Sequence, residues 1–85
     1  MSYTIEFTTS AARELKALER AIQRRIATHI DSLAIDPFPP GSKKLQGEPG
    51  LYRIRVGDYR ILYRVDGKRV TILIVKIGHR RDVYR

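Results

Sequence analysis

Two stretches of this sequence concentrate side chains that could act on a phosphate group. The first holds four arginines, Arg53, Arg55, Arg60 and Arg64, on either side of Gly57-Asp58, and the second is the run Gly78-His79-Arg80-Arg81-Asp82-Val83-Tyr84-Arg85. The planar fork of a guanidinium suits phosphate oxygens, while His and Tyr side chains can exchange protons or stack on a base. These residue types favour binding to, or chemistry on, a phosphodiester.

The basic charge is placed unevenly along the chain. Residues 1–50 carry seven basic and six acidic side chains, whereas residues 51–85 carry ten basic and three acidic ones, so most of the net charge of +8 lies in the second part. Such a concentration favours a polyanionic partner, because neutralising phosphates releases condensed counterions. A basic surface that serves only solubility is the alternative.

Composition excludes several other classes of protein. The sequence has no Cys and its two His lie far apart, so we expect no disulfide and no metal site, and no cofactor is expected. A chain of 85 residues forms one domain, residues 1–85, because it is too short for two cores. No stretch reaches the roughly 18 apolar residues of a membrane span, and residues 1–8 lack a secretory signal, so we expect a cytoplasmic protein without a membrane partner.

The first half of the chain predicts one strand followed by helix. Apolar and polar residues alternate over 1–8, and Thr9 and Ser10 then supply N-cap hydroxyls for a helix with Glu14 in its first turn. An apolar stripe at helical spacing runs from Leu15 to Leu33. No Gly or Pro separates one long helix from a helical hairpin; compactness favours two helices, and the prolines after Asp36 end the helical region.

The second half predicts an antiparallel sheet. Residues 43–47 suit a short edge strand, and longer strands follow at 51–56, 59–65 and 69–77, joined by two-residue turns at Gly57-Asp58 and Asp66-Gly67. The strand at 69–77 is apolar on both faces, so we expect an interior position with the N-terminal strand beside it. The fold class is therefore α+β, with the sheet packed on the helical hairpin in two layers.

A two-residue turn at Gly57-Asp58 would set which side chains share a face. It would pair Arg55 with Arg60, turn the alternating apolar residues of both strands toward the helices, and leave Arg53, Arg55, Arg60 and Arg64 on the other face. Opposed like charges destabilise an antiparallel pair, and a bound anion would reverse that effect. The competing interpretation is that water solvates this face and screens the repulsion between its arginines. The corresponding alternatives are that His79 is a polar residue at the end of a strand and that Tyr84 is an apolar anchor for the C-terminal segment.

Three segments together resemble the RelE/ParE superfamily of type II toxin-antitoxin toxins, and the likeness covers the whole chain. They are Lys44-Leu45-Gln46-Gly47, then Leu51-Tyr52-Arg53-Ile54-Arg55-Val56-Gly57-Asp58-Tyr59-Arg60-Ile61-Leu62-Tyr63, then Lys76-Ile77-Gly78-His79-Arg80-Arg81-Asp82-Val83-Tyr84. The last is similar to the terminal motif of the RelE branch. The resemblance implies a RelE-like two-layer fold and a toxin that cleaves messenger RNA in the ribosomal A site, neutralised by a RelB-like antitoxin.

The resemblance also implies roles for individual residues. Arg53 and Arg55 match basic residues of the active strand, Arg60 the arginine that stabilises the phosphate, Arg80 the arginine near the leaving oxygen and Tyr84 the tyrosine near the attacking hydroxyl. Lys43, Lys44, Arg64 and Arg81 are expected to bind RNA beside them. In this family the 2′-hydroxyl of the RNA is the nucleophile, and no metal takes part. Because the chain stops at Arg85, regulation by a helix after this tyrosine is not expected.

One departure from the family concerns the general base. Arg53 and Arg55 stand where well-known members carry lysines, and a guanidinium stays protonated, so Tyr84 and then His79 are the candidates for accepting the proton. Two alternative functions remain at this point. One is a ParE-like inhibitor of DNA gyrase without nuclease activity, and the other is a non-catalytic RNA-binding module.

Overall fold

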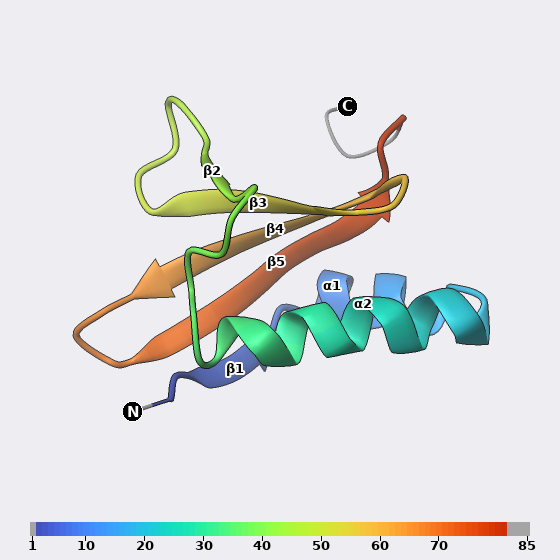
Figure 1. The fold of residues 1–85 in the computed structure, drawn as a ribbon, viewed down its shortest axis with the longest axis horizontal. Coiled ribbons are helices and arrows are strands. Elements are labelled where there is room, and N and C mark those ends of the chain that lie inside the picture. The colour runs from blue at the N-terminus through green and yellow to red at the C-terminus, as the bar shows by residue number, and fades with distance from the viewer. Residues whose placement is uncertain (1, 82–85) are drawn as a thin grey trace.

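A computed structural model describes residues 2–81, which form one sheet with two helices packed on it. The elements in chain order are β1 (Thr4–Phe7), α1 (Thr9–Lys16), α2 (Arg20–Leu33), β2 (Lys43–Lys44), β3 (Leu51–Val56), β4 (Tyr59–Asp66) and β5 (Thr71–His79). The strand order is β1-β5-β4-β3-β2, with β1 parallel to β5 and the other neighbours antiparallel. Figure 1 shows both helices on one side of the sheet, and the α+β prediction is confirmed.

The prediction of two helices is confirmed, with a sharp break between Lys16 and Arg20. Leu18 turns its N–H back to Leu15 O, and Glu19 then takes an extended conformation before α2 begins. Both helices can therefore pack on the sheet. Ala11 from α1 and three residues of α2 enter the core, namely Ile26, Ile30 and Leu33.

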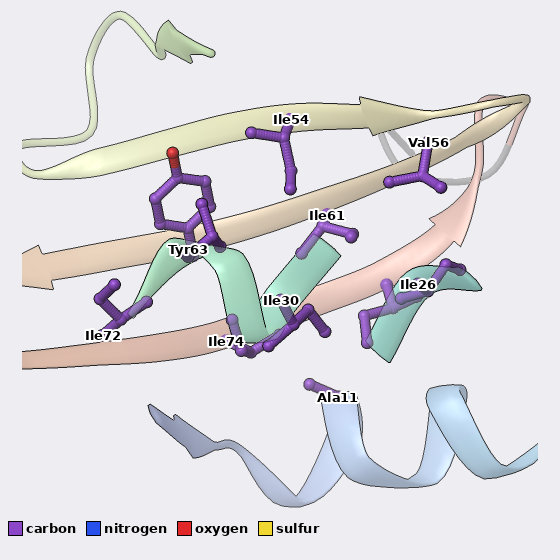
Figure 2. Close-up of a cluster of buried hydrophobic side chains, with 11 residues drawn as sticks. Ala11, Ile26, Ile30, Ile54, Val56, Ile61, Tyr63, Ile72 and Ile74 are labelled. Carbon is purple, nitrogen blue, oxygen red and sulfur yellow. The ribbon is translucent and has the colours of Figure 1, made fainter. Parts of the chain in front are cut away.

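The core lies between these helices and the inner face of the sheet, as Figure 2 shows. Its sheet side is built from Ile54, Val56, Ile61, Tyr63, Ile72, Ile74 and Ile77. Tyr63 is fully buried and its hydroxyl donates to Pro37 O at 2.7 Å, which ties the loop after α2 to the sheet. Burial raises the pKa of Tyr63 to about 12, against a lowering by Ser42.

The N-cap of α1 lies one residue before the predicted one, and Glu14 does not lie in the first turn as predicted. The N-cap is Thr8, whose Oγ1 accepts from Ala11 N at 3.0 Å and donates to Val75 O at 3.1 Å. Glu14 lies beyond the first turn. Its Oε1 accepts from Ile77 N at 3.0 Å and its Oε2 contacts Lys76 Nζ at 2.9 Å. β1 pairs only with residues 71–74 of β5. The Glu14 carboxylate thus binds the β5 backbone beyond the end of β1.

The predicted two-residue turn at Asp66-Gly67 is wrong. β4 continues to Asp66, which pairs with Thr71, so four residues, 67–70, form the loop. The cause is the Asp66 carboxylate, whose Oδ1 accepts from Lys68 N at 3.0 Å and Arg69 N at 3.1 Å and holds the chain in a wider turn. Val70 closes this loop at φ 53° and offers its carbonyl to Thr4 N at 2.9 Å.

Candidate nucleic-acid interface

The predicted register of the β3–β4 hairpin is confirmed. Val56 pairs with Tyr59 across Gly57-Asp58, and Arg55 faces Arg60 directly. Gly57 has φ 61°, which glycine adopts freely and which suits the first position of a type II′ turn. Since the alternate residues of both strands enter the core, Arg53, Arg55, Arg60 and Arg64 share the outer face of the sheet.

The outer face also carries a small apolar cluster that the sequence analysis did not identify. Leu51 and Leu62 are buried there and pack with Leu45 and Val75. The chain between β2 and β3 therefore folds over one end of this face. The cluster separates Arg64 from the other arginines, because Leu62 lies between Arg60 and Arg64 on the outer side of β4.

Arg64 is held by the protein itself. Its Nη1 donates to Pro49 O at 2.7 Å and its Nη2 contacts Glu48 Oε2 at 3.2 Å. Both side chains of the ion pair are largely exposed, so the pair contributes at most about 1 kcal/mol. The guanidinium thereby anchors the turn that precedes β3.

Arg53, Arg55 and Arg60 differ in burial. Arg53 is 8% exposed and Arg55 is exposed, whereas Arg60 is half-buried. The Nε of Arg60 is buried and has no hydrogen-bond partner among residues 2–81. A buried polar group without a partner costs about 1–3 kcal/mol, and an anion that accepts a hydrogen bond from this Nε–H would remove the cost. Arg60 also pairs with Gly78 of β5, which brings no side chain to the face beside it.

The chain after β5 returns to the same end of the hairpin. Arg80 N donates to Asp58 O at 2.8 Å, which brings exposed Arg80 beside the β3–β4 turn. Arg55 and Arg60 are the residue pair one step inside Val56 and Tyr59, the pair that flanks this turn. Arg55, Arg60 and Arg80, three residues of the predicted site, therefore lie at one end of the sheet. Arg81 follows next in the chain.

His79 is placed apart from the arginines. It pairs with Tyr59, which packs against the core on the helix side of the sheet. The centroids of the two rings lie 5.6 Å apart in an edge-to-face arrangement. Its Nδ1 accepts from Arg81 N at 3.3 Å. The register thus puts His79 on the opposite face of the sheet from Arg60, because neighbouring strand residues alternate. Tyr84, the other candidate for the general base, lies outside the described residues.

The two lysines of β2 fall on different faces. Lys43 pairs with Arg53 and so joins the outer face, whereas Lys44 pairs with Tyr52 on the helix side. Both are exposed. Of these two predicted RNA-binding residues, the structure brings only Lys43 together with the arginines.

A pocket of about 400 Å³ opens beside these cations, at the edge of β3. Its lining combines β-strand residues with residues from α2 and the loop after it, namely His29, Ser32, Pro39, Pro40, Gly41, Lys43, Arg53, Ile54 and Arg55. The sequence analysis missed His29 and Ser32. Their spacing of three residues puts them on one side of α2, but only the packing of α2 shows that this side borders the arginines.

The described residues hold neither a group of metal ligands nor a membrane-spanning helix. Residues 2–81 bring no three His, Cys, Asp or Glu side chains together in a group that could hold a metal ion. Neither α1 nor α2, the helices of the described part, is long and apolar enough to cross a membrane.

Comparisons with known proteins place the whole chain in one group. The family described as the ParE toxin of the type II toxin-antitoxin system parDE matches residues 5–84. Toxin RelG of Mycobacterium tuberculosis is 35% identical over 86 aligned residues, covering 100% of this chain and 99% of its own. The toxin-antitoxin complex RelBE2 of the same organism contains a chain with 33% identity and a TM-score of 0.82, covering 93% of this chain and 99% of that one. A chain of the archaeal RelE-RelB complex from Pyrococcus horikoshii has 33% identity and a TM-score of 0.83, covering 98% and 100%.

Proposed function

We propose that this chain, which belongs to the RelE/ParE superfamily as a toxin of a RelBE-type toxin-antitoxin system, is a metal-independent endoribonuclease that cuts messenger RNA on the ribosome. One observation carries the proposal. Arg55 and Arg60 face each other on the outer side of the sheet, and the buried Nε of Arg60 lacks a partner among residues 2–81. This arrangement destabilises the empty protein and favours an anion bound between the strands.

The reaction uses the RNA, these side chains and water. The 2′-oxygen forms a bond to the adjacent phosphorus, the bond from phosphorus to the 5′-oxygen breaks, and a cyclic phosphate and a free 5′-hydroxyl result. Arg60 donates to the phosphoryl oxygens as charge builds on them, and Arg80 stabilises the leaving 5′-oxygen, which takes its proton from water. Such preorganised donors each contribute about 10² to 10³ in rate.

In this proposal Tyr84, as the phenolate, accepts the proton of the 2′-hydroxyl. A guanidinium cannot accept the proton of the 2′-hydroxyl, which excludes Arg53 and Arg55 as general bases. His79 is disfavoured by its position on the other face beside Tyr59. Arg53 and Arg55 instead hold the phosphates that flank the reacting one, and Lys43 and Arg81 extend the basic path for the RNA.

The proposed protein partner is a RelB-like antitoxin. The solved relatives from M. tuberculosis and P. horikoshii are complexes with antitoxins. A net charge of +8, most of it carried by residues 51–85, favours an antitoxin segment rich in acidic residues. Complex formation should then weaken as salt concentration rises.

The test is to add the protein to translating ribosomes and map the ends of the messenger RNA. We expect new 5′ ends within codons for the natural chain and a loss of about 10² to 10³ in cleavage rate for Arg60→Ala. Lys16→Ala is the matched control, because Lys16 is an exposed cation at the end of α1 and does not line the pocket beside the arginines. Equal cleavage by Arg60→Ala and the natural chain would refute the role of Arg60.

The second candidate function is inhibition of DNA gyrase, because the matching family is described by its ParE toxin. A supercoiling assay run on the same preparations separates the two. Intact messenger RNA together with inhibited gyrase would replace the nuclease proposal by this one.

A further inference from the structure

We infer that the pocket at the edge of β3 binds the nucleotide next to the scissile phosphate, and that His29 and Ser32 select a base with an exocyclic amino group over uracil. The position next to the scissile phosphate rests on the proposed function. The selection of the base rests on the lining of the pocket alone.

The size and place of the pocket suit a single nucleotide. Ligand sites in proteins span about 300–1,000 Å³, and this pocket, at about 400 Å³, lies near the lower end. It lies where β3 lacks a neighbour, because β2 pairs only with Tyr52 and Arg53. Arg55 belongs to both places, since it lines the pocket and faces Arg60. Arg55 therefore connects the pocket with the place where Arg60 would hold the RNA.

The lining offers separate surfaces for the phosphate and for the base. Lys43 and Arg55 supply exposed positive charge at the strand side. The opposite side presents the apolar rings of Pro39 and Pro40, with the imidazole of His29 beside them. The proline rings suit packing against the face of a base, which every nucleotide offers, and leave the edge of the base to His29.

The hydrogen bonds within α2 decide which polar groups remain for the base. His29 Nδ1 lies 2.9 Å from Arg25 O, and because a carbonyl only accepts, Nδ1 must donate. Ser32 Oγ likewise donates to Thr28 O at 3.0 Å. The neutral imidazole therefore keeps a lone pair on Nε2, and the serine keeps lone pairs on Oγ. Both groups left for a ligand are acceptors.

Acceptors recognise donors, and this sets the preference. Adenine, cytosine and guanine each carry an exocyclic amino group with two hydrogens to donate, whereas uracil offers a single donor, N3–H, between two carbonyl oxygens that these acceptors repel. Loss of one neutral hydrogen bond corresponds to roughly a 3- to 10-fold change in an equilibrium or rate. We expect uracil at this position to slow cleavage by about that factor.

The experiment compares variants on RNAs that differ only in the nucleotide beside the cleaved bond. For His29→Ala and for Ser32→Ala, the cleavage rates of the four RNAs should differ less from one another than they do for the natural chain. Thr28→Ala is the matched control: Thr28 makes the same kind of bond to a carbonyl four residues earlier, to Arg24 O at 3.0 Å, but does not line the pocket. It should keep the full preference.

A binding measurement separates this inference from the nuclease proposal. Uncleavable 2′-O-methyl trinucleotides are titrated while the His29 ring resonances are followed by NMR, with inorganic phosphate as the comparison. A protein that cuts no RNA yet binds amino-bearing trinucleotides through His29 would fail the proposed function and support the base selection. Cleavage with an unchanged base preference in His29→Ala would overturn the inference and leave the nuclease intact. A response to phosphate equal to that of the trinucleotides, or stronger binding of an extended peptide at this edge, would also overturn it.

Discussion

The two faces of the β3–β4 hairpin carry the same alternation of residues for opposite purposes. On the inner face, apolar pairs such as Ile54 with Ile61 are buried against the helices and supply stability. On the outer face, Arg55 and Arg60 are like charges on directly paired residues, and their repulsion costs stability. The contrast teaches that folding accounts for the apolar pairs of the inner face, whereas the opposed arginines of the outer face are accounted for by the anion that we propose they bind.

The largest expected effect is on the inner face. Ile61→Ala should lower the free energy of unfolding by about 2–5 kcal/mol, because Ile61 is fully buried and its truncation leaves a cavity in the centre of the core. Denaturation with urea measures the change. RNA cleavage per folded molecule should stay close to that of the natural chain, and a selective loss of cleavage would break the division between the faces.

The outer face should show the reverse pattern. Arg60→Ala should lower the cleavage rate by about 10² to 10³, equal to about 2.7–4 kcal/mol of transition-state stabilisation. Its free energy of unfolding should change by less than about 1 kcal/mol, because the variant also removes the repulsion with Arg55. Single-turnover cleavage and urea denaturation on one preparation check both values. Unfolding of the variant would show that Arg60 serves stability after all.

The inner face should also respond to alkaline pH through Tyr63. Since folding raises the pKa of Tyr63 from 10.0 to about 12, the associated stability is complete below pH 10 and is lost as the pH rises toward 12. The loss amounts to roughly 2–3 kcal/mol at about 1.4 kcal/mol per pKa unit. Tyr63→Phe lacks this titration, so urea denaturation at pH 8 and pH 11 should show a smaller decline in the variant. Equal declines would mean that other groups cause the alkaline loss.

The smallest effect is expected at the far end of the outer face. Arg64→Ala should lower the free energy of unfolding by no more than about 1 kcal/mol, because its ion pair with Glu48 is exposed. Its cleavage rate should fall far less than that of Arg60→Ala, since its guanidinium already binds Pro49 O and Glu48. A loss as large as that of Arg60→Ala would extend the site across the apolar cluster.

Local patterns accounted for the hairpin but not for every turn. The strand at 51–56 and the turn at Gly57-Asp58 follow from strict alternation and from a glycine where φ is positive. The predicted two-residue turn at Asp66-Gly67 is a four-residue loop in the structure. The Asp66 side chain accepts hydrogen bonds from two backbone N–H groups beyond this dipeptide, so the dipeptide pattern does not include them. Glu14 was expected in the first turn of a helix. Its carboxylate instead binds Ile77 N at the edge of β5, 63 residues away in sequence.

The sequence by itself determined the strands of the sheet, the faces of the hairpin and the concentration of positive charge, because alternation and residue type act over a few neighbouring residues. Only the tertiary structure decided that His79 faces away from Arg60, that Lys43 and not Lys44 shares the face of the arginines, and that His29 lines the same pocket as Arg55. These relations depend on strand register and on the rotation of α2 about its axis. Both are set by how the core side chains of distant segments pack together, such as Ile26 and Ile30 against Ile61 and Ile74.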